Sequence, residues 1–204
     1  MKQLVFDFGG VLFQWQPPRL IQRELPHLAT DEATAKALAE KFFQNYSGDW
    51  ADFDRGTVTP PDLVQRIARR TGLAAADVQR VVDGVPRELQ PVPETLGLLR
   101  RLRDAGRGLY FLSNMPGPYA THLEQTHACV GWFRDGVFSA RVAFIKPEAA
   151  IYQLAAVRFG HAPEDLVFMD DHLPNVLAAR QQGWNALHFS SAAAAEAELS
   201  QNGW

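Results

Sequence analysis

The feature that most constrains this chain is a short apolar segment at its amino terminus that ends in one acid and two glycines. The segment from Gln3 to Phe8 carries Asp7 as its single charged residue, and Gly9 and Gly10 follow directly. A short apolar run that ends in a turn is typical of a buried parallel strand. Asp7 would then lie at the carboxyl end of this strand, the edge at which open α/β sheets bind ligands. A carboxylate is costly to bury without a partner, so Asp7 requires a metal ion, a hydrogen-bond donor or a catalytic role.

The composition limits the protein class. The 204 residues are 47% hydrophobic, enough to form one large domain or one domain with an insertion. The net charge of −3 predicts no general attraction to nucleic acid or membrane. The single cysteine excludes an internal disulfide, no signal peptide is visible, and no apolar run approaches the roughly 18 residues that span a bilayer. We expect a cytoplasmic monomer or homodimer.

About 70 residues without a convincing strand separate the first strand from the next. The segment 11–18 ends in a proline pair, which cannot lie inside a helix. Apolar periodicity then predicts four helices, at residues 19–27, 31–46, 60–71 and 74–84. We therefore predict an all-helical cap at residues 15–91, inserted into an α/β core made of residues 1–14 and 92–204.

Strands and helices alternate in the remainder of the chain. Short apolar runs predict strands at residues 108–112, 136–140, 166–169 and 185–189, with helical segments between them. This alternation predicts parallel pairing with right-handed crossovers. The expected fold class is α/β, with a Rossmann-like parallel sheet between two helical layers.

Four polar features fall at strand ends or helix starts. They are Asp7, Ser113-Asn114, Lys146 and Asp170-Asp171. Taken singly, the acids and Ser113 could simply cap helices. Lys146 lies just before a helix, at the end where the dipole disfavours a cation, so a nearby anion explains it better than simple exposure.

In this order the four features resemble the motifs of the haloacid dehalogenase superfamily. The matching stretches are 7–12, 111–114, 146–148 and 168–176. The resemblance covers essentially the whole chain, and the helical cap of that family would correspond to the predicted insertion.

The resemblance implies a nucleophilic Asp7 that forms an aspartyl-phosphate, which water then hydrolyses. At ~3.5 Å two unit charges repel by about 5 kcal/mol at an effective dielectric constant near 20, so an anionic nucleophile needs a cation to approach phosphate. The implied cofactor is Mg²⁺, bound by the Asp7 and Asp171 side chains and the Gly9 carbonyl. Asp170 would be a further ligand or would accept a hydrogen bond from metal-bound water.

The other motif residues would hold the phosphate. Ser113 and the backbone N–H groups of Asn114 and Met115 would bind it, and Lys146 would neutralise charge in the transition state. Asn175 would either orient the surroundings of the metal or only cap and pack its helix.

One position departs from the family pattern. Phosphatases of this family usually carry a second aspartate, the general acid and base, two residues after the nucleophile, where this chain has Gly9. A sugar-phosphatase-like branch has glycine there. The proton for the leaving group would come from water, the cap or the substrate, and a steep dependence of rate on leaving-group pKa is expected.

Substrate selection is expected in the cap, where Trp15 and Arg55 are the main candidates. Further candidates, most of which could instead pack the cap, are Phe42, Tyr46, Trp50 and Phe53. The predicted function is Mg²⁺-dependent hydrolysis of a small phosphorylated metabolite such as a sugar phosphate. The alternatives are a metal-independent dehalogenase and a catalytically degenerate protein that binds a phosphorylated ligand or has a regulatory role.

Overall fold

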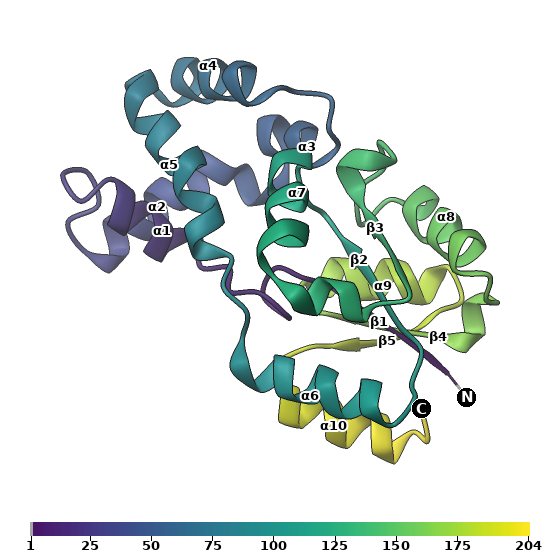
Figure 1. Ribbon diagram of the computed structural model, residues 1–204. Coiled ribbons are helices and arrows are strands. Elements are labelled where there is room, and N and C mark those ends of the chain that lie inside the picture. Colours follow the sequence, from purple (N-terminus) through teal and green to yellow (C-terminus); the bar gives the residue numbers. More distant parts are fainter. Residues whose placement is uncertain (1) are drawn as a thin grey trace.

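The computed structural model describes residues 2–204 and has a five-stranded parallel sheet at its centre (Figure 1). The strands are β1 (Gln3–Phe6), β2 (Leu109–Ser113), β3 (Asp135–Phe138), β4 (Leu166–Asp170) and β5 (Asn185–His188). Their order, β3-β2-β1-β4-β5, places β1 between β2 and β4. Phe6 pairs with Met169, so Asp7 lies just past the end of β1 and beside the end of β4.

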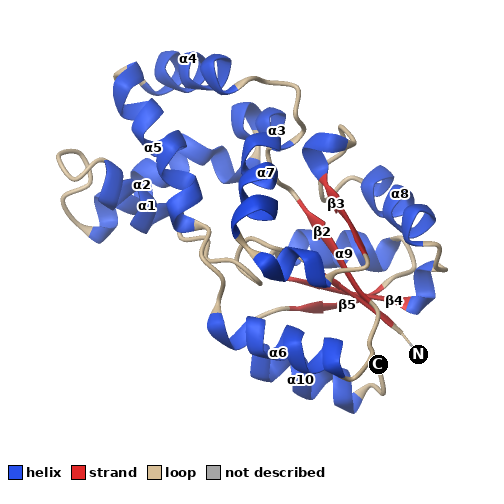
Figure 2. Ribbon diagram, in the orientation of Figure 1, coloured by secondary structure: helices blue, strands red, loops and turns tan. Residues whose placement is uncertain are grey.

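Helices cover both faces of the sheet (Figure 2). Along β1, Leu4 and Phe6 join one apolar cluster and Val5 joins the other, as expected from the two-residue period of a strand. The first cluster packs against α6 (Pro93–Asp104), α7 (Gly117–Thr126) and α10 (Ala192–Gln201). The second packs against α8 (Ala149–Phe159) and α9 (Leu173–Gln181). The predicted three-layer α/β/α fold class is confirmed.

The insertion is helical throughout its regular structure. It contains α1 (Pro17–Glu24), α2 (Glu32–Phe43), α3 (Gly48–Asp54), α4 (Pro60–Thr71) and α5 (Ala75–Glu88). The chain enters and leaves it through adjacent segments, because Gln14 N–H donates to the Gln90 carbonyl at 2.8 Å and Val92 N–H donates to the Leu12 carbonyl at 2.9 Å. All five helices fall inside the predicted range 15–91, although the division into two domains stays a prediction.

Several helix boundaries in the cap differ from the prediction, including the end of α5, which lies at Glu88 rather than at residue 84. Helix α1 begins at Pro17 rather than at residue 19, because proline is tolerated in a first turn, where its missing N–H has no partner to lose. Helix α2 ends at Phe43 rather than at residue 46, because residues 44–46 all have positive φ angles. The helix α3 that follows was not predicted, since it has only 7 residues and begins with glycine.

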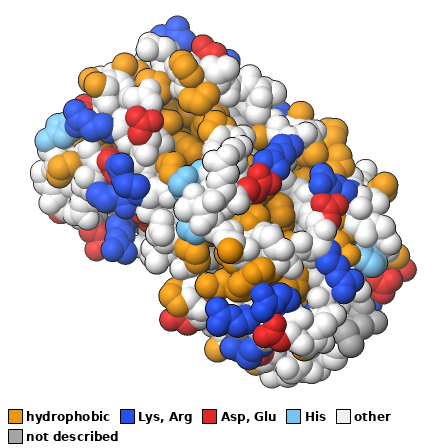
Figure 3. All heavy atoms as spheres, viewed as in Figure 1, with side chains coloured by type: hydrophobic (Ala, Val, Ile, Leu, Met, Phe, Trp, Pro, Cys, Tyr) orange, Lys and Arg blue, Asp and Glu red, His pale blue; other side chains and the backbone are white. Residues whose placement is uncertain are grey.

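Short 3₁₀ helices complete the structure at Gln44–Tyr46, Ala128–Trp132, Ser139–Arg141 and Pro163–Asp165. On the face shown in Figure 3, basic and acidic side chains are interspersed. The surface of the protein also carries exposed ion pairs such as Arg101–Glu196. Between residues 2 and 204, none of the helices combines the length and the hydropathy needed to span a membrane.

Candidate active site

The ends of β1 and β4 bring two acids to one buried lysine. Lys146 Nζ lies 2.8 Å from Asp7 Oδ1 and 2.6 Å from Asp170 Oδ2, and all three side chains are buried. Burial excludes the alternative of an exposed lysine. The anionic surroundings predicted for Lys146 are therefore two carboxylates of the protein itself, which raise the pKa of the ammonium group despite its burial.

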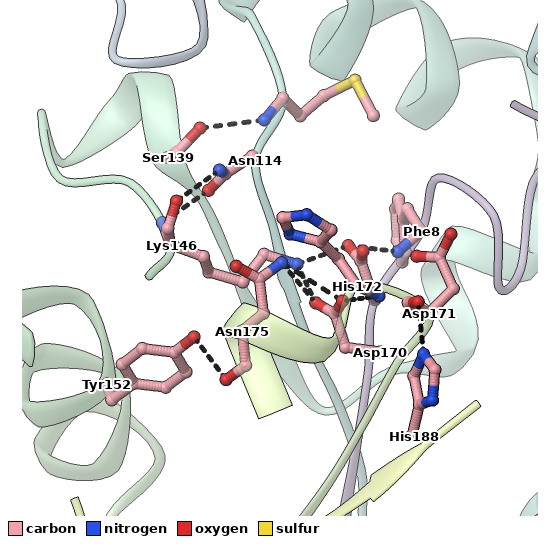
Figure 4. Close-up of polar contacts among 12 residues, drawn as sticks. Phe8, Asn114, Ser139, Lys146, Tyr152, Asp170, Asp171, His172, Asn175 and His188 are labelled. Carbon is pink, nitrogen blue, oxygen red and sulfur yellow. Dashed lines mark hydrogen bonds and ion pairs between the residues drawn. The ribbon is translucent and has the colours of Figure 1, made fainter. Parts of the chain in front are cut away.

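Asp170 is held by several donors (Figure 4). Besides Lys146, the Asn175 amide donates to both carboxylate oxygens at 3.1 and 3.0 Å, and the His172 N–H donates to Oδ1 at 2.7 Å. This pattern favours a positioning role for Asp170, with a role as direct metal ligand the weaker alternative. Asn175 contacts the acid directly, so it does more than cap its own helix.

Asp7 is fixed by its neighbours but keeps one oxygen free. Its Oδ1 accepts from the Phe8 N–H at 2.7 Å and contacts Lys146, which leaves Oδ2 without a partner among residues 2–204. The Phe8 side chain is fully buried, and its ring centroid lies 4.6 Å from that of Phe111. This packing anchors the loop that follows β1. The carboxylate is thus oriented and still available at one oxygen.

The residues present fit a divalent cation. Carboxylate oxygens of Asp7, Asp170 and Asp171 lie within 4.8 Å of one another, and Lys146 is the counter-charge of Asp7 and Asp170. Burial raises the pKa of Asp7 to about 8, the two other carboxylates act in the same direction, and Lys146 opposes them. A bound cation would stabilise all three acids in the ionised form. Asp171 is exposed, and although its backbone carbonyl contacts His188 Nε2 at 2.8 Å, its carboxylate has no hydrogen-bond partner from another residue in 2–204 and is free to coordinate.

Gly10 allows the loop after β1 to pass close to Asp171. It has a φ of +76°, and a Cβ added there would lie 2.2 Å from Asp171 Oδ2. Gly9 differs, because a Cβ there would lie 3.7 Å from the nearest Trp15 atoms, which is an ordinary contact. Gly10 is therefore required for the placement of Asp171, whereas the Gly9 position has room for a Cβ atom.

Replacing Gly10 by alanine is expected to reduce Mg²⁺-dependent activity roughly 10- to 100-fold, because the new methyl group displaces Asp171. Gly72→Ala is the matched control, since Gly72 has a φ of +75° with no atom within 4 Å of the added methyl. Both variants should lose roughly 1–2 kcal/mol of stability from backbone strain. Mg²⁺ titrations of activity check the prediction, and equal metal dependence in the two variants would contradict it.

The predicted phosphate-binding segment is only partly free. The Ser113 hydroxyl is buried and has no partner within residues 2–204. The Asn114 side chain is engaged, since it donates to the Lys146 carbonyl at 2.9 Å and accepts from the Lys146 N–H at 2.8 Å. The Met115 N–H donates to Ser139 Oγ at 2.8 Å and is therefore not free for phosphate, which corrects the prediction for that group.

A cavity of about 250 Å³ adjoins Asp7, Lys146 and Asp171. Of the predicted cap residues, Trp15, Tyr46 and Trp50 line it. Phe42 and Phe53 do not, because they are buried in the apolar cluster of the cap.

Arg55 also lies outside the cavity wall, contrary to its predicted contact with substrate. Its guanidinium group forms two hydrogen bonds with the Glu148 carboxylate, at 2.9 and 2.5 Å, and its contact joins the cap to the core.

Asp54 is a further site residue that the sequence prediction does not include. It is the last residue of α3, is only 4% exposed and lines the cavity. Burial raises its pKa to about 8, with Lys146 opposing this shift. A signal exists in the sequence, because Trp50, Phe53 and Asp54 stand at positions i, i+3 and i+4 and so share one helix face.

Comparison with known proteins agrees with this geometry. A family model described as haloacid dehalogenase-like hydrolase matches residues 1–183. A sesquiterpene phosphatase of Aspergillus oryzae is 30% identical over 201 residues, covering 98% of this chain and 95% of that protein. An (S)-2-haloacid dehalogenase of Pseudomonas fluorescens is 26% identical over 189 residues, covering 88% of this chain and 80% of that protein.

Among solved structures, a HAD-family enzyme of Bacteroides thetaiotaomicron, in complex with magnesium and inorganic phosphate, superposes with a TM-score of 0.73. It is 22% identical, and the match covers 94% of this chain and 95% of that one. The fold, the order of the polar motifs along the chain and the family match together show that this chain belongs to the haloacid dehalogenase-like hydrolases.

Proposed function

We propose that this protein is a Mg²⁺-dependent phosphatase that hydrolyses phosphomonoesters through an aspartyl-phosphate at Asp7. The observation that carries the proposal is the meeting of Asp7, Lys146 and Asp171 at one cavity. The similarity to a phosphatase of Aspergillus oryzae supports it.

The residues around the cavity suit the two chemical steps. Asp7 Oδ2, the free oxygen, would attack phosphorus while Lys146 offsets negative charge on the phosphoryl oxygens. The unpartnered Ser113 hydroxyl would donate to one of these oxygens, which would satisfy a buried polar group. Asp7, Asp171 and the Gly9 carbonyl would hold Mg²⁺, whose charge would reduce the repulsion between nucleophile and phosphate.

The cavity wall favours a substrate with an apolar body. Beyond the charged end, the wall includes Trp15, Trp50, Val85, Leu89, Met115 and Tyr119. Two of its polar atoms are already engaged, because the Tyr119 hydroxyl donates to the Val82 carbonyl and Trp15 Nε1 donates to the Tyr46 hydroxyl. We therefore place a phosphate ester of an apolar alcohol ahead of a sugar phosphate, and the Aspergillus phosphatase named for sesquiterpenes points the same way.

A series of n-alkyl monophosphates tests this substrate class. Each added methylene that enters the cavity is worth about 0.8 kcal/mol, so kcat/KM is expected to rise roughly three- to fourfold per carbon until the cavity is full. Glucose phosphates should be hydrolysed more slowly than the longer alkyl phosphates. A rate independent of chain length, with faster hydrolysis of sugar phosphates, would contradict the apolar assignment.

Dehalogenation is the second candidate, because (S)-2-haloacid dehalogenases are also among the relatives. In that reaction an aspartate displaces halide from carbon, and no metal is needed. The cluster of Asp7, Asp170 and Asp171, with a single lysine opposing it, favours the metal-dependent reaction instead. Halide release from a 2-chlorocarboxylate, measured with and without Mg²⁺, distinguishes the two candidates.

A further inference from the structure

We propose that Asp54, which belongs to the cap, donates the proton that the leaving alcohol requires and so replaces the acid that is missing at Gly9. The inference rests on the proposed phosphatase function. Of the three proton sources left open by the sequence, which are water, the cap and the substrate, the structure favours the cap.

Asp54 is placed to act on a substrate in the cavity. It lines the same cavity as Asp7 and Lys146, although it comes from the cap, at the end of α3. The residue is 96% buried, and its carboxyl group forms no hydrogen bond or ion pair with another residue in 2–204. A buried carboxyl group with no partner is costly, so a structural role alone does not explain this one.

The core fixes the position of Asp54 through contacts with the Asp54 carbonyl group and with the side chain of the next residue, Arg55. Ser139 Oγ donates to the Asp54 carbonyl at 2.5 Å, and the same hydroxyl accepts from the Met115 N–H, next to the predicted phosphate-binding segment. The neighbouring Arg55 pairs with Glu148 and donates to the Ala143 carbonyl at 3.2 Å. The acid is thus tied to the core, although its helix belongs to the cap.

The surroundings of Asp54 keep it protonated at neutral pH. The charged and titratable groups that face it are Lys146 and Asp7 from the core and the hydroxyls of Tyr46 and Tyr119. Lys146 is already engaged by two carboxylates, and a negative charge at the carboxyl end of a helix gains nothing from the dipole. These conditions agree with the raised pKa of Asp54, so a proton is available for transfer.

The two steps balance as follows. In the first step an Asp7 oxygen bonds to phosphorus, the ester P–O bond breaks, and the Asp54 proton moves to the departing oxygen, giving the alcohol and an Asp54 carboxylate. In the second step a water oxygen bonds to phosphorus and the Asp7–phosphorus bond breaks. One water proton passes to Asp54, which restores the acid.

Single-turnover release of the alcohol, in the presence of Mg²⁺, measures the first step alone. The substrates are a nitrophenyl phosphate, whose leaving group needs no proton, and an alkyl phosphate, whose leaving group does. Asp54→Asn is expected to slow alcohol release from the alkyl ester by about 10²- to 10⁴-fold, with release of nitrophenol nearly unchanged. The control is Asp52→Asn, in the same helix but partly exposed and paired with Arg66, and it should leave both rates unchanged.

A second variant tests whether proton donation to the leaving group, rather than Asp54 itself, is what the reaction requires. Because a Cβ atom fits at Gly9 and Gly9 borders the cavity, Gly9→Asp introduced into the Asp54→Asn protein is expected to restore part of the rate with the alkyl ester. If Asp54 donates the proton, the first-step rate of the wild type should depend only weakly on leaving-group pKa. A steep dependence is expected if no residue replaces the acid that is missing at Gly9. This wild-type measurement holds even if a variant fails to fold.

Three outcomes would overturn the inference. They are equal losses with both substrates in Asp54→Asn, no loss with the alkyl ester, and a steep leaving-group dependence in the wild type. If the wild type hydrolyses neither ester with Mg²⁺, the proposed phosphatase function itself fails, which is a different result from any of these three.

Discussion

Replacing Asp7 by asparagine is expected to abolish Mg²⁺-dependent phosphate hydrolysis, with a loss on the order of 10⁴- to 10⁶-fold in kcat. The amide is a poor nucleophile, and it also removes a predicted metal ligand. The fold should remain, because Asp7 is one of three carboxylates that face a single lysine, and a neutral side chain reduces their repulsion. The melting temperature is therefore expected not to fall.

Steady-state hydrolysis of a nitrophenyl phosphate and thermal unfolding check this prediction together. Asp104→Asn is a suitable control, because Asp104 lies at the end of α6 on the surface and pairs with the neighbouring Arg103. Hydrolysis that survives in Asp7→Asn, with the Mg²⁺ dependence of the wild type, would contradict the assignment of Asp7 as nucleophile.

Replacing Lys146 by methionine is expected to impair both stability and activity. The lysine is 3% exposed and is the counter-charge of Asp7 and Asp170, so its removal leaves two carboxylates buried together. Breaking a buried ion pair in this way typically costs about 3–5 kcal/mol of unfolding free energy. The loss of positive charge beside the phosphoryl group should lower kcat by a further factor of about 10² to 10³.

Denaturant unfolding and kinetics at saturating Mg²⁺ measure the two effects separately. Lys2→Met is the matched control, because Lys2 pairs at 3.7 Å with Asp165 on the surface, where such a pair contributes about 0–1 kcal/mol. If Lys146→Met unfolded at the wild-type denaturant concentration and kept its kcat, the proposed role of this lysine would be wrong.

The meeting of the polar motifs could be predicted from sequence because parallel strands bring their carboxyl ends to one edge. Asp7 follows β1 and Asp170 is the last residue of the adjacent strand β4, and Lys146 joins them from the loop before α8. A helix cap can also be predicted from sequence, because it depends on residues that are close together in the chain. An example is Asp31, whose side chain accepts from the Thr34 N–H. The contacts confirm this juxtaposition, while the catalytic roles stay predictions.

The contacts between cap and core could not be predicted from local pattern. The charged residues Asp52, Asp54 and Arg55 are typical of an exposed surface, and only the packing of α3 against the core at Ser139 and Glu148 buries Asp54 and directs Arg55. The same limit explains Met115, whose N–H is taken by Ser139, 24 residues further along the chain. The charged end of the cavity can be predicted from the residue types at strand ends. The residues that the cap contributes to the cavity cannot, because they depend on tertiary packing.

Mass spectrometry of enzyme quenched with acid during turnover tests the central claim most directly. With an aryl or alkyl phosphate and Mg²⁺, a phosphoryl group is expected on Asp7, in the peptide that contains the end of β1, and it should be absent from Asp7→Asn. A protein that turns over substrate while the phosphoryl group forms on another residue, or on none, would contradict the proposed mechanism.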